Sequence, residues 1–321
     1  MTDNYGREVN YMRVSITDRC DLRCVYCMPE GCEKVSMSQI LTYEEIERIC
    51  RAAAGLGISR IKITGGEPFV RRGCTDLIRR IKAIGGIEEV TVTTNGQTLD
   101  KYIDELKEIG IDGVNISLDS LDPDNYRYIT GGGELAKTLN SIELSAKSGI
   151  KTKVNCILQK GCNEDELFDL AGLAFTYGID VRFIEEMPVG AGKLRAGISN
   201  DDVLKRLKER WPDLEPDESI HGNGPAVYYK RGGIPGAIGL ISPIHGVFCA
   251  ECNRIRLTSQ GKIRPCLCYD REIDIVPALA GTDEEIAGVL RAAILAKPEA
   301  HCFSDTGFEG AEGRLMSQIG G

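Results

Sequence analysis

Four cysteines lie close together near the start of the chain, in the stretch DRCDLRCVYCMPEGC from Asp18 to Cys32. Cys20, Cys24 and Cys27 are spaced C-x3-C-x2-C directly after an expected strand. Thiols at such spacing in a reducing compartment point to a metal site or to catalysis. A structural zinc site would need Cys32 as its fourth ligand, whereas three thiolates hold a 4Fe-4S cluster with one iron open. The spacing favours the cluster and leaves Cys32 outside its ligand set.

A second cysteine group occurs in the C-terminal third, where Cys249, Cys252 and Cys266 are spaced C-x2-C-x13-C. Cys268 follows two residues later, so this group also offers the four thiolates of a zinc ribbon. The spacing alone leaves zinc and a cluster open. Between the second and third cysteines stands the stretch RIR, and a purely structural zinc site has no need of a guanidinium pair beside its thiolates. The arginines therefore favour a cluster that also binds a ligand.

Composition narrows the class of protein. The chain has 321 residues and 13 cysteines, an odd number that suits a disulfide framework poorly. Its first residues do not read as a signal peptide, and no apolar run approaches the roughly 18 residues of a membrane span. We therefore expect a cytoplasmic enzyme without a membrane partner. The net charge of −9 argues against a nucleic-acid-binding surface but permits a local basic pocket.

Strand-like and helix-like segments alternate over the first two thirds of the chain, which predicts a parallel sheet with helices outside. The expected strands are Tyr11–Ile16, Arg60–Thr64, Val90–Thr94, Val114–Leu118, Lys153–Leu158 and Val181–Glu185. The expected helices are Tyr43–Leu56, Thr75–Ile84, Leu99–Ile109, Leu135–Ser148, Glu164–Tyr177, Asp201–Glu209 and Asp283–Leu295. Six units are fewer than the eight of a closed barrel, so we predict an open, partial (β/α)6 TIM-like barrel over residues 1–220. Residues 221–321 would form a small α+β module around the second cysteine group.

Five expected strands, four of those above and the segment RIRLTS (Arg254–Ser259), contain a basic residue within the run, although strands of parallel sheets usually read as continuous apolar runs. These residues are Arg13, Lys62, Lys153, Arg182 and Arg256. Each could lie at a solvent-exposed strand end. Five together favour a shared position inside the barrel, where the cost of burying charge would be offset by an anionic ligand such as a triphosphate.

The first cysteine group resembles the signature of the radical S-adenosylmethionine superfamily, because the aromatic residue Tyr26 precedes the last cysteine. TGGEP, Thr64–Pro68, follows the second expected strand and is similar to that superfamily's glycine-rich motif for the methionyl amino group. Glycine permits a ligand to approach the backbone closely. In combination with the cysteine loop this motif is specific, although alone it would be weak.

Over nearly its whole length the chain is similar to the GTP 3′,8-cyclase family of molybdenum cofactor biosynthesis. The matching stretches are RVSITDRC, KITGGEPFVRR, VTTNG, NISLDSLD, KVNCIL, RFIEEM, FCAECNRIRLTSQGKIRPC and SQIGG. The resemblance implies two 4Fe-4S clusters, one on each cysteine group, and the second would bind the purine of GTP. The implied GTP contacts are Arg13, Lys62, Thr93, Lys153, Arg254, Ile255 and Arg256. The implied S-adenosylmethionine contacts are Tyr26, Gly66, Ser117 and Met187. Catalytic roles are expected for Arg182, Arg256, Gly320 and Gly321.

The resemblance also implies a reaction. Cleavage of S-adenosylmethionine gives a 5′-deoxyadenosyl radical that takes the ribose 3′ hydrogen of GTP, after which the ribose attacks guanine C8. The product, 3′,8-cyclo-7,8-dihydro-GTP, would pass to cyclic pyranopterin monophosphate synthase. We also expect an external one-electron reductant and a monomer or homodimer. Two alternatives stay open: a radical enzyme acting on a peptide, whose relatives usually have more C-terminal cysteines, and a zinc-stabilised binding module without catalysis.

Overall fold

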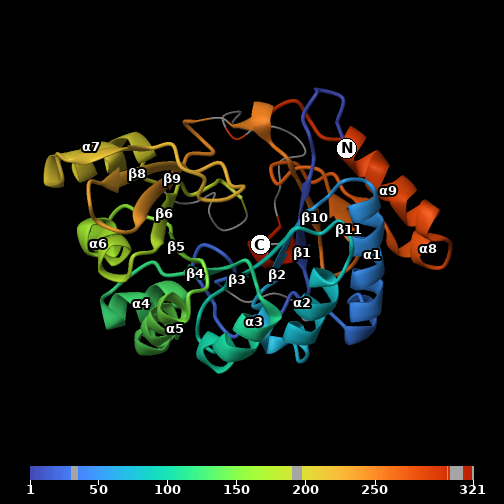
Figure 1. The fold of residues 1–321 in the computed structure, drawn as a ribbon, viewed down its shortest axis with the longest axis horizontal. Helices are drawn as coiled ribbons and strands as arrows, with labels where there is room; N and C mark the ends of the chain where they lie inside the picture. The colour runs from blue at the N-terminus through green and yellow to red at the C-terminus, as the bar shows by residue number, and fades with distance from the viewer. Residues whose placement is uncertain (30–34, 190–196, 247, 302, 304–313, 320–321) are drawn as a thin grey trace.

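One curved sheet contains strands from the N-terminal and the C-terminal thirds of the chain. The computed structural model describes residues 1–29, 35–189, 197–246, 248–301, 303 and 314–319. Within these residues twelve strands follow the order β12-β11-β10-β1-β2-β3-β4-β5-β6-β9-β8-β7. The helices lie along the outer side of the curve (Figure 1).

The middle of the sheet is parallel. Its first six strands are β1 (Tyr11–Ser15), β2 (Arg60–Thr64), β3 (Glu89–Thr94), β4 (Gly113–Ser117), β5 (Thr152–Cys156) and β6 (Asp180–Ile184). Each pairs in parallel with the next. The predicted open barrel of six strand–helix units is therefore confirmed.

The strands of the C-terminal third join this sheet at both edges. β10 (Arg254–Leu257) pairs in parallel with β1, and β9 (Ala237–Ile241) pairs in parallel with β6. Antiparallel strands then extend each edge, namely β11 (Lys262–Arg264), β12 (Ile273–Asp274), β8 (Val227–Arg231) and β7 (Leu214–Asp217). The α+β module is present, but its strands complete the barrel's sheet, and the boundary near residue 220 stays a prediction.

The helices follow the expected order. They are α1 (Tyr43–Gly55), α2 (Cys74–Lys82), α3 (Ile103–Ile109), α4 (Pro123–Thr130), α5 (Leu135–Ser148), α6 (Leu167–Tyr177), α7 (Asn200–Arg210), α8 (Val276–Leu279) and α9 (Asp283–Leu295). Short 3-10 turns are η1 (Met37–Gln39), η2 (Pro68–Val70), η3 (Leu99–Lys101), η4 (Glu164–Glu166), η6 (Cys249–Glu251) and η7 (Met316–Gln318). Sequence reasoning missed α4, a short helix that begins at Pro123 and is capped by the Asp122 carboxylate.

The two faces of the parallel strands differ in chemistry. Side chains at alternate positions, among them Met12, Val14, Ile61 and Ile63, are fully or almost fully buried in the core beneath the helices. The intervening positions face the interior of the curve, where polar side chains line a cavity. Because side chains alternate across a strand, this pattern places each isolated basic residue on the inner face.

Candidate active site

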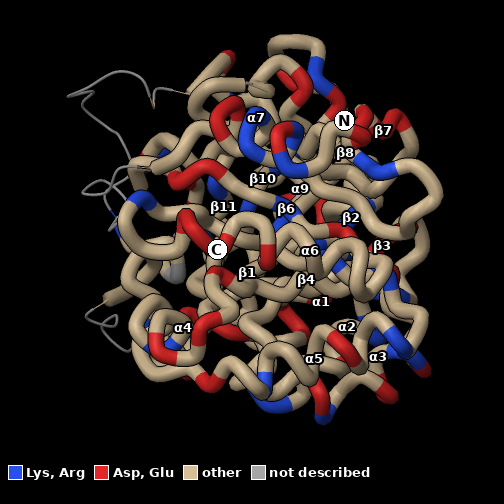
Figure 2. Tube along the Cα trace, turned by 90° about the vertical axis from the view of Figure 1, so that its left-hand side faces the viewer, with Lys and Arg blue, Asp and Glu red and all other residues tan. Residues whose placement is uncertain are grey.

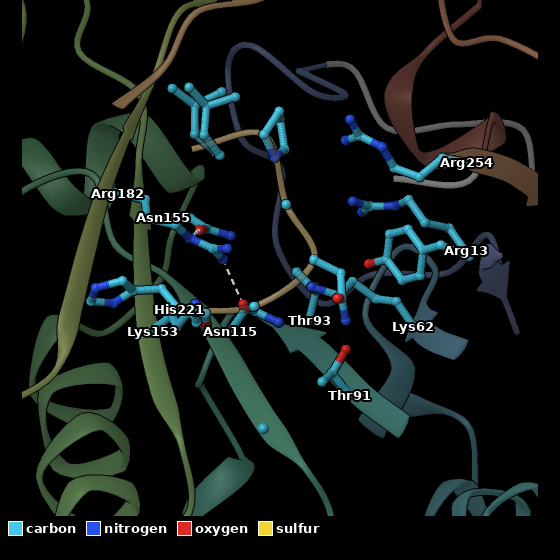
Figure 3. Close-up of a pocket in the computed structure, with 18 of the residues that line it drawn as sticks. Arg13, Lys62, Thr91, Thr93, Asn115, Lys153, Asn155, Arg182, His221 and Arg254 are labelled. Atoms are coloured by element: carbon cyan, nitrogen blue, oxygen red, sulfur yellow. Dashed lines mark hydrogen bonds between the residues drawn. The ribbon is translucent and has the colours of Figure 1, made fainter. Parts of the chain in front are cut away.

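A cavity inside the barrel brings together the basic residues that sequence analysis selected from separate strands. Arg256, Arg13 and Lys62 are at one level of three adjacent strands, because Arg13 pairs with Arg256 of β10 and with Lys62 of β2. The basic side chains that line the cavity are Arg13, Lys62, Lys151, Lys153, Arg182, Arg254 and Arg256. All five predicted inner-face cations are among them, so the prediction of a common location is confirmed. Figure 3 shows Arg13, Lys62 and Arg254 opposite Arg182 and Lys153.

These cations repel one another in the protein alone. Burial lowers the pKa of Arg13, an effect that nearby Tyr11 opposes and the Arg254 and Arg182 guanidinium groups reinforce. The pKa of Lys62 is well below its usual value, first because of burial and then because of neighbouring cations. Burial is also the main cause of the lowered pKa of Arg256. A polyanion in the cavity would reverse these effects.

Two asparagines position Arg182, and neither was singled out from the sequence. The Arg182 Nε donates a hydrogen bond to Asn155 Oδ1 at 2.9 Å, and its terminal nitrogen donates to Asn115 Oδ1. Figure 3 shows the Arg182–Asn115 bond as a dashed line. Asn155 on β5 is the register partner of Arg182 on β6, whereas Asn115 lies one strand further away, on β4. An asparagine on a parallel strand has no distinctive sequence signal, which explains the omission.

The first cysteine group lies on a loop that glycine backbones allow to pack closely. The backbone N–H of Arg23 donates to Thr130 O at 2.8 Å, which ties the loop to the end of α4. A Cβ on Gly131 would stand 2.5 Å from Arg23 O, and one on Gly66 would stand 2.3 Å from Arg19 O. The Gly66 position therefore needs glycine because the glycine-rich turn and the cysteine loop touch, in addition to any ligand contact.

A second cavity adjoins this loop. It is lined by all the predicted S-adenosylmethionine contacts and first-group cysteines, namely Cys20, Cys24, Tyr26, Cys27, Gly66, Ser117 and Met187. It shares Arg13, Thr93, Ile157, Met187 and Met316 with the cationic cavity, so the two are neighbours. A ligand at the cysteine loop can therefore contact a ligand held by the cations.

Buried carboxyl groups surround the cysteine-loop cavity. The Tyr26 hydroxyl donates to Asp119 Oδ2 at 2.7 Å, and burial raises the pKa of Asp119 to about 6. Glu67 accepts hydrogen bonds from the Thr94 hydroxyl at 2.8 Å and the Asn95 N–H at 2.7 Å. Burial nonetheless raises the pKa of Glu67 to about 7. Sequence reasoning included Glu67 only as part of a glycine motif and missed Asp119.

The thiols of the first group fit an iron–sulfur cluster. All three cysteines are free of disulfides. Burial raises the pKa of Cys20 to about 12, so an isolated thiol here would be protonated, whereas cluster iron stabilises the thiolate. Among the residues that the structure describes, no three His, Cys, Asp or Glu side chains are arranged to hold a single metal ion. Cys32 lies outside the described residues.

The second cysteine group is surrounded by cations and backbone donors. Lys297 Nζ lies 3.5 Å from Cys252 Sγ and donates to Arg254 O at 2.6 Å. The backbone N–H of His301 donates to Cys249 Sγ at 3.3 Å, and Arg7 donates to Cys249 O at 2.9 Å. Burial would raise the pKa of Cys252, but Lys297 and Arg254 lower it below its usual value. These donors suit a thiolate-ligated cluster, and neither Lys297 nor Arg7 had a recognisable signal in the sequence.

Three predicted residues need separate comment. The Ile255 side chain is fully buried in the core, on the face opposite Arg254 and Arg256, so only its backbone could contact a ligand in the cavity. Gly320 and Gly321 lie outside the described residues. Met316 of η7 lines both cavities, which places the segment before the two glycines at their junction.

Comparisons with known proteins agree with this geometry. The radical SAM superfamily model matches residues 14–174, and the Molybdenum Cofactor Synthesis C model matches residues 179–303. The GTP 3′,8-cyclase of Alkaliphilus oremlandii is 48% identical over 327 residues and that of Heliobacterium modesticaldum is 42% identical over 328 residues, with 100% of each chain covered. The chain belongs to the GTP 3′,8-cyclase family. As a member of this radical SAM family it carries two 4Fe-4S clusters and uses S-adenosylmethionine.

Solved structures support the fold alone. Streptococcus suis SuiB bound to S-adenosylmethionine has a TM-score of 0.65 at 16% identity, covering 97% of this chain and 77% of SuiB. Native anSMEcpe with bound AdoMet has a TM-score of 0.59 at 14% identity, covering 91% of this chain and 82% of that one. Both share the partial barrel of this family member.

Proposed function

We propose that this chain converts GTP to 3′,8-cyclo-7,8-dihydro-GTP, the first step of molybdenum cofactor biosynthesis. One observation supports this most strongly: a cavity lined by seven basic side chains adjoins the cavity at the cysteine loop. The first suits a nucleoside triphosphate and the second suits S-adenosylmethionine. A peptide substrate would have no need of so many cations on the inner face.

The chain's own residues hold the reactants in place. When bound, a cluster on Cys20, Cys24 and Cys27 supplies the reductive chemistry that S-adenosylmethionine needs for removing a ribose hydrogen. Tyr26, Gly66, Ser117 and Met187 would contact S-adenosylmethionine, since all four line its cavity. Arg13 and Thr93 line both cavities and would hold the ribose end of GTP at their junction.

The other basic residues of the cationic cavity would bind the purine and the triphosphate of GTP. Arg254 and Arg256 follow the second cysteine group on β10, so a purine bound at that group would lie on their side of the cavity. Lys62, Lys153 and Arg182 would then stabilise the triphosphate by charge-assisted hydrogen bonds. Arg182 and Arg256, together with the tail Gly320–Gly321, stay the predicted catalytic set.

Further roles follow from the chemistry of the reaction. We propose an external one-electron reductant, transfer of the product to cyclic pyranopterin monophosphate synthase, and a cytoplasmic location. No helix of the described residues is long and apolar enough to cross a membrane.

Anaerobic reconstitution tests the proposal directly. The holoenzyme should contain about eight iron and eight sulfide per chain. Incubation with GTP, S-adenosylmethionine and a reductant should then yield 5′-deoxyadenosine and cyclised nucleotide, both measured by mass spectrometry. Zinc in place of iron, or 5′-deoxyadenosine with unchanged GTP, would overturn it.

A further inference from the structure

A glycine-rich loop forms part of the cationic cavity and has no role in the function described above. The loop connects β7 to β8 and contains the stretch HGNGP, His221–Pro225. All five of its residues line the cavity. None of them lines the cavity at the cysteine loop. The loop therefore contacts the part of the cavity away from the S-adenosylmethionine site.

Its position follows from the strand ends that it contacts. Asp180 and Glu89 are the first residues of β6 and β3, and Lys153 is the second of β5. The His221 Nδ1 lies 2.9 Å from Asp180 Oδ1, and the Asn223 amide donates to Glu89. The loop thus lies at the amino ends of the parallel strands, whereas the cysteine loop follows the carboxyl end of β1.

His221 is held on several sides. Its Nε2 lies 3.1 Å from Asp217 Oδ2, and its ring stacks on Tyr228 with centroids 3.9 Å apart. Lys153 Nζ contacts Asp180 Oδ2 at 3.0 Å and the Tyr228 hydroxyl at 3.0 Å, and it also donates to the His221 carbonyl. These contacts fix the start of the loop against a cation of the cavity.

The two glycines bring the loop backbone close to two cations. A Cβ built on Gly222, whose φ is +147°, would stand 3.4 Å from Lys153 Nζ. A Cβ built on Gly224 would stand 4.0 Å from a terminal nitrogen of Arg182. In Figure 3 the loop leaves His221 and crosses the view between the Arg182 side and the Lys62 side of the cavity. Any anion that Lys153 and Arg182 hold together is therefore near this backbone.

The backbone donors of this loop are available. Within the described parts of the chain, no group accepts a hydrogen bond from the N–H of Gly222, Asn223 or Gly224. Unpaired N–H groups next to buried cations are a recurrent arrangement for binding phosphate, because successive amides present several donors to one anion. Here they occur on a loop whose ends are fixed by side-chain contacts.

We propose that the loop His221–Pro225 binds the terminal phosphate of the nucleotide through its backbone N–H groups, beside Lys153 and Arg182. This inference rests on the proposed function. The ribose must lie at the junction with the S-adenosylmethionine cavity, and the purine is expected on the β10 side. The triphosphate then extends towards β5 and β6, and its last phosphate is the group that reaches the loop. The loop thus makes the enzyme prefer a triphosphate to a diphosphate.

The test compares nucleotides on the reconstituted holoenzyme under anaerobic conditions. Dissociation constants for GTP and GDP would be measured by calorimetry for the wild type, Gly222→Ala and the matched control Gly233→Ala. Gly233 also has a positive φ, at +71°, but an added Cβ there meets nothing within 4 Å. The control therefore imposes backbone strain outside the cavity. Asn223→Ala, which removes the bond to Glu89, is a second loop variant in case Gly222→Ala does not fold.

We expect the wild type to bind GTP more tightly than GDP. Either loop variant should weaken GTP binding about tenfold, the loss of one hydrogen bond to a charged group, and leave GDP binding unchanged. Gly233→Ala should bind both nucleotides as the wild type does. Equal weakening of GTP and GDP, or no weakening, would overturn the role of the loop. A wild type that binds neither nucleotide would instead contradict the proposed function.

Discussion

The two adjoining cavities have opposite charge. The cysteine-loop cavity is lined by one cation, Arg13, and by three carboxyl groups, on Glu67, Glu185 and Glu186. The other is lined by seven basic residues and by two carboxyl groups, on Glu89 and Asp112. S-adenosylmethionine carries a sulfonium and an ammonium group, whereas GTP is a polyanion. We therefore expect charge to direct the two reactants to different cavities before any specific contact forms.

The same contrast extends to the cysteines. Burial raises the pKa of Cys20 and Cys24, and nearby carboxylates add to the effect. In the second group Lys297 and Arg254 lower the pKa of Cys252 against the effect of burial. A cluster close to carboxylates is harder to reduce than one close to cations. We expect the first cluster to have the more negative reduction potential.

The largest expected effect separates the two cysteine groups. Cys20→Ser should abolish the cleavage of S-adenosylmethionine, because the cluster there loses a ligand, while the second cluster remains. Cys24→Ser and Cys27→Ser should behave alike. The assay is 5′-deoxyadenosine formation with electron paramagnetic resonance of the remaining cluster. Cleavage that survives in any one of these variants would show that the first group has been misassigned.

Substitutions in the tail Gly320–Gly321 test whether this segment acts at the junction of the two cavities. Gly320→Ala combined with Gly321→Ala should keep both clusters and still cleave S-adenosylmethionine, but yield no cyclised nucleotide. The reason is position: Met316 lines both cavities and Ile319 is fully buried, so the chain is docked next to the tail. Product and 5′-deoxyadenosine would be measured together. Product at the wild-type rate would remove the tail from the catalytic set.

The cations of this cavity should favour GTP binding and should destabilise the folded protein when GTP is absent. Lys62→Met removes a cation whose pKa burial and neighbouring cations lower, so it should weaken GTP binding by roughly ten- to a hundredfold. In the absence of GTP it should raise the free energy of unfolding by about 1–2 kcal/mol. Calorimetry and urea titration measure the two effects. Lys101→Met, at an exposed position, is the control and should alter neither.

The fold was more predictable than the site. The periodicity of apolar residues predicted the parallel strands. The isolated basic residues predicted which face of each strand points inward, because a charge inside an apolar run is easily recognised. The partners of those residues could not be found in this way. Asn115 and Asn155 hold Arg182 from other strands, and Lys297 reaches Cys252 across 45 positions of sequence. Such contacts depend on register and on long-range packing, which leave no mark on local sequence.

Glu67, one of the carboxyl groups that line the cysteine-loop cavity, makes the stability of the folded state depend on pH. The pKa of Glu67 is raised from 4.5 to about 7, so the folded state binds a proton that the unfolded state releases. This stabilisation is complete below about pH 4.5 and is lost as pH rises through about 7. Wild-type stability should therefore fall by about 2 kcal/mol between pH 5.5 and 8 through this group.

Glu67→Gln should lack that share of the decline. Urea titrations of the wild type and the variant at the two pH values measure it. Identical pH dependence in the two proteins would mean that Glu67 is ionised throughout.

The smallest expected effect concerns the fourth thiol of the second group. Cys268 is almost fully buried, and its backbone N–H donates to Cys266 Sγ at 3.4 Å. Because Cys266 is the predicted third ligand, Cys268→Ser should be close to the wild type in iron content and product formation. Loss of the second cluster in this variant, with Cys266→Ser tolerated, would mean that the third ligand is Cys268.

The pairing of β1 with β10 has a consequence for how the chain is made. During translation one edge of β1 has no partner until Leu257 of the 321 residues has been synthesised. An apolar strand with an unpaired edge invites aggregation, so a nascent chain or a fragment ending before β10 should need chaperone protection. Arg256 enters the cavity on the strand that covers this edge. The pairing of β10 with β1 therefore covers the exposed edge of β1 and adds Arg256 to the cationic cavity in the same folding event.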